Sequence, residues 1–254
     1  MARPPVLFIG HGSPMNAIQN NRYTQMLQAT GHAIAQPKAV LIISAHWETQ
    51  GTLVHLSKTP KTIYDFGGFP SALYKIQYPC AGAVEIAELL VQRGIAKGDT
   101  AWGLDHGAWT VLKHLAPKAD VPCVQLSLNQ QLDLKGHYQL AQSLRFLRDM
   151  GVLIIGSGNL IHNLRQISWQ ENTQAFDWAK EIDQRVKIAI EERDDAFFLE
   201  KWPKDSQFKL AHPSLEHYLP MIYTLGVRDE KDQCKTLFEE IHHGSIAMRC
   251  LSWG

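Results

Sequence analysis

Apolar segments of two lengths alternate along the chain, and together they predict its secondary structure. Short aliphatic runs that lack regular polar alternation are typical of strands buried on both faces of a sheet, and they occupy residues 6–9, 39–44, 121–126 and 152–155. Longer segments repeat apolar residues with helical spacing, at 21–35, 82–93, 107–115, 135–149, 174–193 and 215–225. Gly94 and Gly151 directly follow two of these segments, as left-handed helix caps commonly do.

This order of elements predicts the fold class. Strands that alternate with helices indicate an α/β fold in which helices cover both faces of a largely parallel sheet. The final segment, 235–251, returns to strand-like residues, and we expect it to add antiparallel pairing at an edge, which makes the central sheet mixed. Charge is spread evenly and no linker rich in Gly, Pro and Ser interrupts the chain. We therefore expect a single domain over residues 1–254.

Composition narrows the classes of partner. The 254 residues include 25 basic and 25 acidic side chains, and this zero net charge argues against nucleic acid as a partner. No apolar stretch approaches the ~20 residues that a membrane-spanning helix needs, so we expect no membrane association. The four cysteines form no CxxC pair and are expected to be reduced thiols of a cytoplasmic protein, namely Cys80, Cys123, Cys234 and Cys250.

Candidate chemistry gathers where the predicted strands end. His11 comes two residues after the first strand, His46 follows the second, and His162 follows the strand at 152–155. His217 is expected in the first turn of a helix that Ser214 can cap. The carboxyl ends of parallel strands share one edge of a sheet, and ligand sites lie outside that edge. These histidines can therefore converge although they are far apart in the sequence.

A metal site must be weighed against ordinary structural histidines. Six of the 12 histidines lack special neighbours and are interpreted as structural: His32, His55, His114, His137, His242 and His243. Glycines bracket His11 and precede His162, and such small neighbours let backbone and ligand approach closely. Neutral imidazoles suit zinc, iron, copper and nickel, and three protein ligands with open positions are a catalytic arrangement. The sequence therefore favours a catalytic metal site.

Two further segments carry candidate site residues. In 101–109, Asp105 can either orient the imidazole of His106 or cap the following helix. In 64–70, aromatic residues flank a Gly-Gly turn, which suits a wall over a planar apolar ligand and equally suits an ordinary packed loop. Phosphate-binding glycine motifs are absent, and the surroundings of Ser157 do not match the GxSxG pattern of serine hydrolases.

The motifs GHGSPM, SAHW, DFGGFP, WGLDHGAW, GSGNLIHN and EHYLP occur in this order. The set resembles the class III extradiol ring-cleavage dioxygenases, and within them the bacterial type of the 4,5-DOPA extradiol dioxygenase group. The similarity runs from about residue 5 to residue 250. It implies a single catalytic α/β domain around a mixed sheet. It also implies oxidative opening of a catechol ring, with a small-molecule catechol and O2 as the reaction partners.

The resemblance assigns roles to the histidines. It implies that His11, His46 and His217 are the metal ligands, although more distant members use a glutamate and Glu216 lies beside His217. It makes His162 the catalytic acid and base, close enough to become a fourth ligand when zinc is bound without substrate. A histidine suits that role because its ordinary pKa of about 6.5 lets it both accept and donate a proton near neutrality.

The same resemblance extends to the substrate pocket. It gives His106 a catalytic position lining the pocket, where it would hydrogen-bond substrate or oxygen. The expected substrate contacts are Phe66, Trp47 and Ser13. The stretch at 165–170 is similar to the bacterial type rather than to the plant enzymes, so the expected substrate is L-DOPA or a related catechol.

One non-haem divalent metal per chain is the expected cofactor. Iron(II) is expected for turnover because zinc cannot pass electrons between a catecholate and O2, while zinc(II) also fits as the bound ion. A zinc-dependent hydrolase of an amide or ester is the alternative enzyme, since the same histidines would serve it. A non-enzymatic zinc-binding protein is the other alternative. The sequence favours no particular oligomeric state.

Overall fold

One eight-stranded sheet forms the centre of the computed structural model, which describes residues 3–170 and 173–254. The strands of this sheet are β1 (Val6–Gly10), β2 (Ala39–Thr49), β3 (Leu53–His55), β4 (Lys97–Asp99), β5 (Cys123–Asn129), β6 (Val152–Gly158), β7 (Cys234–Phe238) and β10 (Cys250–Trp253). Their order is β4-β3-β5-β2-β6-β1-β10-β7. A separate two-stranded sheet consists of β8 (Ile241–His242) and β9 (Ile246–Ala247).

The pairing confirms a mixed sheet with a parallel centre. β5, β2, β6 and β1 are parallel neighbours, whereas β10 pairs antiparallel with β1 and β7 pairs antiparallel with β10. The C-terminal segment therefore supplies the antiparallel edge that its strand-like residues predict. All four parallel strands carry near-continuous apolar runs because both of their faces are covered.

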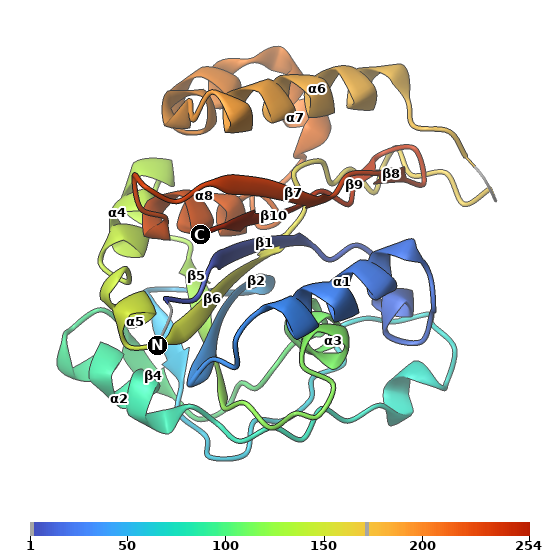
Figure 1. Ribbon diagram of the computed structural model, residues 1–254. Coiled ribbons are helices and arrows are strands. Elements are labelled where there is room, and N and C mark those ends of the chain that lie inside the picture. Colours follow the sequence, from blue (N-terminus) through green and yellow to red (C-terminus); the bar gives the residue numbers. More distant parts are fainter. Residues whose placement is uncertain (1–2, 171–172) are drawn as a thin grey trace.

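Helices cover both faces of the sheet (Figure 1). The α-helices are α1 (Arg22–Ala33), α2 (Val84–Gln92), α3 (His106–Leu115), α4 (Leu134–Gln142), α5 (Phe146–Asp149), α6 (Asp177–Glu191), α7 (Ser206–Ala211) and α8 (Leu219–Val227). Short helical turns are η1 (Pro14–Ala17), η2 (Leu73–Lys75), η3 (Phe197–Lys201) and η4 (Trp202–Lys204). α1 and α3 lie on one face, α4 and α8 on the other, and α6 and α7 form an outer layer beyond α8.

The alternation of strand side chains divides the core into two layers. In β1, Phe8 joins the core shared with α8, while Leu7 and Ile9 join the core shared with α1 and α3.

The two helix ends that were predicted from glycines are confirmed. Gly94 and Gly151 have φ angles of +67° and +87°, the left-handed conformation that glycine adopts without strain.

Several predicted boundaries are corrected. The second strand does not end at residue 44 but runs to Thr49, past a register irregularity, so His46 lies inside β2. The helix expected at 135–149 is divided into α4 and α5. At the break, the Ser143 hydroxyl donates to the Leu140 carbonyl, the kind of local bond with which serine competes against helix continuation. β3 and β4 were missed because three-residue strands are too short to show a period.

The segment before α8 also differs from the expectation. The helix begins at Leu219, so His217 lies in the preceding turn and Ser214 is not its cap. Ser214 instead donates a hydrogen bond to the Glu216 carboxylate. Pro220 occupies the second helical position, where a residue without an N–H is tolerated, and it fixes the beginning of the helix there.

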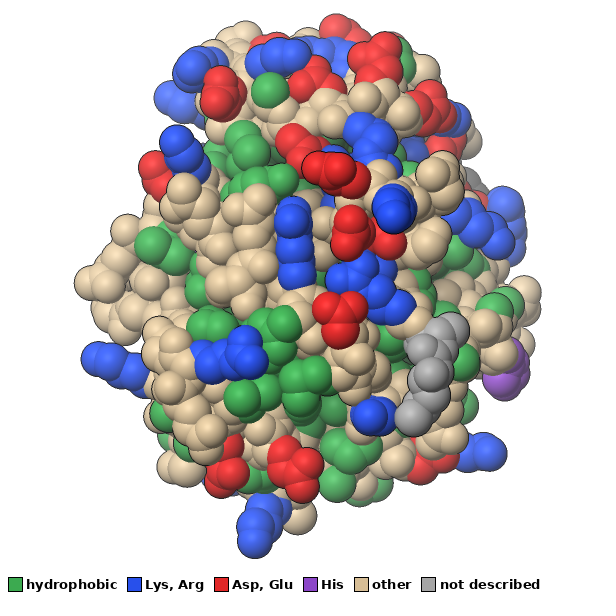
Figure 2. Space-filling view, turned by 60° about the vertical axis from the view of Figure 1, so that its left-hand side comes forward, with side chains coloured by type: hydrophobic (Ala, Val, Ile, Leu, Met, Phe, Trp, Pro, Cys, Tyr) green, Lys and Arg blue, Asp and Glu red, His purple; other side chains and the backbone are tan. Residues whose placement is uncertain are grey.

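The surface carries no excess of one charge on the face that Figure 2 shows, where acidic and basic side chains are interspersed. Cys80, Cys123, Cys234 and Cys250 are free thiols, in agreement with the expectation from their spacing. Within residues 3–170 and 173–254, no helix is both long and apolar enough to cross a membrane.

A buried ion pair joins three distant parts of the chain. The Arg148 side chain, 1% exposed, donates to both carboxylate oxygens of Asp232 at 2.5 and 3.1 Å and to the Pro4 carbonyl at 3.2 Å. Asp232 also accepts a hydrogen bond from the Asp229 backbone N–H. The pair thereby holds the segment before β1, the helix α5 and the segment before β7 together.

Replacing Asp232 with alanine is expected to lower the free energy of unfolding by about 3 kcal/mol or more, because the Arg148 guanidinium stays buried without its counter-charge. Chemical denaturation monitored by circular dichroism measures this loss. Asp177→Ala is the matched control, since that carboxylate pairs with Lys180 at the surface and is fully exposed. Equal stability of the two variants would contradict a structural role for the buried pair.

Candidate active site

Three of the predicted site histidines meet at the carboxyl edge of the parallel strands. His11 follows β1, His46 lies late in β2, and His217 lies in the turn before α8. Their ring centroids are 5.0 Å apart for His11 and His46, 5.2 Å for His11 and His217, and 4.9 Å for His46 and His217. One ring nitrogen of each lies within 4.8 Å of the others, which is close enough for one ion to contact all three.

The orientation of His11 is set by hydrogen bonds behind its ring. Its Nδ1 lies 3.0 Å from the Ser157 hydroxyl, and that hydroxyl donates to the Gly107 carbonyl at 2.6 Å. Because the hydroxyl proton is used in this way, the Ser157 oxygen accepts from Nδ1–H. The lone pair of His11 is then on Nε2, which lies 3.1 Å from His46 Nε2 and points into the cluster.

The other two histidines have carboxylates on the same side of their rings. Glu216 Oε1 lies 3.0 Å from His217 Nδ1 and also accepts from the Ser214 hydroxyl. Asp65 Oδ2 lies 3.5 Å from His46 Nδ1. In each case the carboxylate favours a proton on Nδ1 and leaves Nε2 with its lone pair. Glu216 thus contacts the back of His217, as an orienting partner of a ligand would.

Burial keeps these imidazoles neutral. Desolvation, followed by the neighbouring histidines, lowers the pKa of His11 and of His217 well below the ordinary value. Desolvation and the charge of His106 lower the pKa of His46 to about 3, although Asp65 opposes the shift. Neutral imidazoles with oriented lone pairs are the donors that a transition metal or zinc requires, so this donor set fits a divalent non-haem metal.

A close backbone contact brings His217 to the strand edge. The Asn159 backbone N–H donates to the His217 carbonyl at 2.9 Å, directly beyond the end of β6. A Cβ atom on Gly158 would lie 2.2 Å from that carbonyl oxygen, well inside contact distance. Only glycine at this position lets the turn before α8 approach β6, which explains the glycines that precede His162 in the sequence.

His162 lies beside the cluster rather than among its three nitrogens. Its ring stacks on the His217 ring with centroids 3.5 Å apart and planes 8° apart. Its backbone N–H donates to the Ala211 carbonyl, which holds the loop after β6 against the end of α7. Burial and the charge of His106 lower its pKa to about 4, so the ring is neutral near pH 7.

His106 opens α3 and is held by a residue that the sequence interpretation did not single out. The Asp65 carboxylate accepts from His106 Nδ1 and from the His106 backbone N–H, both at 2.8 Å. Burial raises the pKa of Asp65, but its hydrogen bond and charge interaction with His106 outweigh burial and lower it. The sequence did contain an indication of this role. Asp65 is the one acidic residue in the aromatic segment 64–70, and a purely apolar wall would not require a charged side chain there.

Asp105 has the second of its two predicted roles. Its side chain caps α3 by accepting from the Ala108 backbone N–H at 3.1 Å, and it accepts from the Ser44 hydroxyl at 2.7 Å. Burial and the nearby Asp65 raise its pKa to about 6, against the effect of hydrogen bonds from Ser44 and Gln125. Asp65, and not Asp105, orients the His106 imidazole.

Comparison with known proteins identifies the family. Residues 4–249 match the family described as the catalytic LigB subunit of aromatic ring-opening dioxygenase. The chain belongs to this family. The match contains the whole histidine cluster and every strand of the central sheet except β10, which begins at Cys250.

Individual relatives agree with the family match. A protein of Escherichia coli K12 named 4,5-DOPA dioxygenase extradiol is 38% identical over 258 aligned residues, which cover 99% of this chain and 95% of the relative. A Beta vulgaris protein of the same name is 37% identical and covers 97% of this chain and 93% of its own. The crystal structure of an uncharacterized E. coli K12 protein matches with a TM-score of 0.86 at 33% identity, covering 99% of this chain and all of that chain.

The three residues predicted to contact substrate in this LigB-family chain have different neighbours in the structure. Phe66 presents its ring to His106 edge-on, with centroids 5.5 Å apart. Ser13 is half-buried and caps η1 by accepting from the Met15 backbone N–H. Trp47 is buried and stacks in parallel on the Trp102 ring. Substrate contact by these three residues stays a prediction, and Phe66 is the one whose ring faces a site histidine.

The histidines interpreted as structural have other surroundings. The His114 ring bonds to the Asn16 carbonyl, and the His137 ring bonds to the Tyr223 hydroxyl. His32 is exposed at the end of α1. The others lie in or beside short strands, namely His55 in β3, His242 in β8 and His243 after β8.

Asp65→Ala is expected to lower kcat by about 10- to 100-fold at saturating metal, because the His106 ring loses the acceptor that fixes its tautomer and direction. Steady-state kinetics on protein of verified metal content would measure the change. Asp149→Ala is the matched control, since that carboxylate lies at the end of α5 and pairs with Arg3 at the surface. Equal kcat values for the two variants would contradict a role of Asp65 in positioning His106 for the reaction.

Proposed function

We propose that the chain is a single-domain extradiol dioxygenase that opens the ring of a catechol with O2. The observation that carries the proposal is the convergence of His11, His46 and His217, each with Nδ1 facing a partner and Nε2 directed inward. Three oriented neutral nitrogens would hold one divalent metal and leave positions for two reactants. Membership of the ring-opening dioxygenase family supplies the reaction class.

Iron(II) is the metal we propose for turnover, because it can exchange electrons with a catecholate and with O2, whereas zinc(II) would fill the same nitrogens without redox chemistry. The names of the relatives, 4,5-DOPA dioxygenase extradiol, support L-DOPA or a related catechol as substrate. His162 would complete the zinc-bound resting site as a fourth ligand, supported by its 3.5 Å stacking on His217.

The remaining site residues would manage protons and position the ring. His162 is neutral and borders His217, so it would accept the proton of a catechol hydroxyl and return it later as an acid. His106, held by Asp65, would present its other nitrogen as a hydrogen-bond partner to substrate or oxygen. Phe66 would pack against the aromatic ring beside His106.

The decisive test is oxygen uptake by protein that is stripped of metal and reloaded anaerobically with iron(II) or zinc(II). We expect stoichiometric O2 consumption and a yellow ring-opened product in the iron form only, because zinc cannot exchange electrons. L-DOPA, dopamine, caffeate and protocatechuate would be compared with an oxygen electrode and by absorbance. A filled metal site with no oxygen uptake for any catechol would refute the proposal and favour the zinc hydrolase.

His162→Ala is expected to retain one metal per chain and substrate binding but to lose about 100-fold or more in kcat, the usual contribution of a general acid–base group. Single-turnover kinetics in the iron form would measure the loss. His137→Ala is the matched control, because that histidine bonds to Tyr223 outside the cluster. An unchanged kcat for His162→Ala would show that His162 is not the general acid and base of the reaction.

A further inference from the structure

His162 differs from the other site histidines in how its ring is held. Each of the other four has a hydroxyl or carboxylate oxygen facing its Nδ1, namely His11, His46, His106 and His217. Among the residues that the structure describes, no side chain forms a hydrogen bond to the His162 ring, which stacks on His217. A ring without a fixed acceptor keeps both nitrogens available for proton transfer. Its position must then be set through the backbone.

The helix α7 supplies part of this backbone support. The last carbonyls of a helix have no partner within the helix and accept hydrogen bonds from elsewhere. In α7, the Ala211 carbonyl accepts from the His162 backbone N–H at 2.9 Å, and the Leu210 carbonyl accepts from the Asn163 side-chain amide at 2.7 Å. The end of α7 therefore holds the chain both at His162 and at the residue that follows it.

Asn163 is also fixed within its own loop. Its side-chain oxygen accepts from the Arg165 backbone N–H at 3.0 Å, the local bond with which asparagine commonly reverses the chain. Its backbone carbonyl accepts from the Ser245 hydroxyl at 3.0 Å and from the Gln166 backbone N–H at 3.1 Å. Asn163 is buried, and these bonds make the chain turn immediately after His162.

The outer layer of Figure 1 supports α7 in turn. Asp205 caps the beginning of α7 by accepting from the Gln207 backbone N–H at 2.9 Å. The same carboxylate accepts from the Arg185 guanidinium of α6 at 2.7 Å. The position of α7, and through it that of Asn163, is therefore tied to α6.

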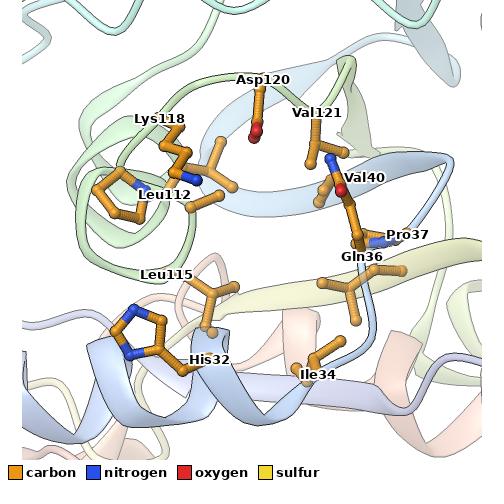
Figure 3. A pocket seen from close by; sticks show the side chains of 14 residues that line it. His32, Ile34, Gln36, Pro37, Val40, Leu112, Leu115, Lys118, Asp120 and Val121 are labelled. Atoms are coloured by element: carbon orange, nitrogen blue, oxygen red, sulfur yellow. The ribbon is translucent and has the colours of Figure 1, made fainter.

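A hollow of about 220 Å³ lies at the other end of the parallel strands (Figure 3). Val40 and Val121 line it near the beginnings of β2 and β5, and most of its other lining side chains are apolar. His46 lies late in β2, so the length of the sheet separates this hollow from the histidines. It therefore takes no part in positioning His162.

We propose that Asn163 is a positioning residue for the reaction, whose side chain holds His162 against His217 for proton transfer. The assignment rests on the proposed acid–base role of His162 in catechol cleavage, to which it adds the group that places the ring. Asn163 acts through His162, since its own side-chain atoms bond to Leu210 and Arg165.

Asn163→Ala is expected to lower kcat about tenfold, the loss of about one buried hydrogen bond, and to leave KM and metal content unchanged. Asn163→Asp keeps the acceptor for Arg165 but has no N–H for the Leu210 carbonyl, so it should show a similar loss if the alanine variant fails to fold. Asn129→Ala is the matched control. Its side chain also ties a loop after a parallel strand, by accepting from two backbone N–H groups. It should keep the wild-type kcat.

A double-mutant cycle distinguishes positioning of His162 from a general structural role. Asn163→Ala should lower kcat about tenfold in the wild-type background and not at all in the His162→Ala background, because its effect passes through that ring. Steady-state kinetics with L-DOPA on protein of verified iron content would measure both effects. Equal effects in the two backgrounds, or an equal loss for Asn129→Ala, would overturn the assignment and leave catechol cleavage standing.

Crystal structures of zinc-loaded wild type and Asn163→Ala give a measurement that does not depend on turnover. If no catechol is consumed, the proposed function fails, and Asn163 is judged by geometry alone. In the variant, the His162 ring should leave its stacked position on His217, while His11 and His46 keep theirs. A His162 ring that remains stacked would reject the assignment.

Discussion

The geometry of the site depends on one close approach, that of the His217 backbone to the end of β6. The carbonyl of His217 accepts from the Asn159 N–H, and the missing side chain of Gly158 is what leaves room for it. His11 directly follows β1 and His46 lies in β2. Both strands are parallel neighbours of β6, so strand pairing alone positions these two histidines. His217 instead lies in the turn before α8, outside the sheet. Its backbone contact with Asn159 is what holds that turn, and so the His217 ring, beside the other two histidines.

Around this frame, each histidine is oriented from behind by a different kind of acceptor. A hydroxyl faces His11, and carboxylates face His46 and His217. The result is the same in each case, because a proton held on Nδ1 leaves the lone pair on Nε2. Burial acts in the same direction, since it lowers the pKa of all three rings and keeps protons from competing with a metal.

Much of the fold could be predicted from the sequence, because strands and helices follow from local patterns. The strand-end pattern also predicted that His11, His46 and His162 lie close together, whereas the choice of His217 as the third ligand came from the family resemblance. Apolar runs identify the four parallel strands, and histidines after strand ends must meet at one edge. Asp65 and the extension of β2 past His46 could not be predicted in this way. Both depend on which segments the tertiary structure brings together: Asp65 matters only because its loop lies over the first turn of α3, and β2 continues only because β5 is beside it to pair with Glu48 and Thr49.

The tertiary structure also sets the electrostatic character of the site. The centre has neutral imidazoles and compensated carboxylates, as metal binding and proton transfer require. A cationic side chain at the centre would pair with Asp65 or Glu216 in place of the histidines that they orient, and it would perturb the imidazoles that must stay neutral.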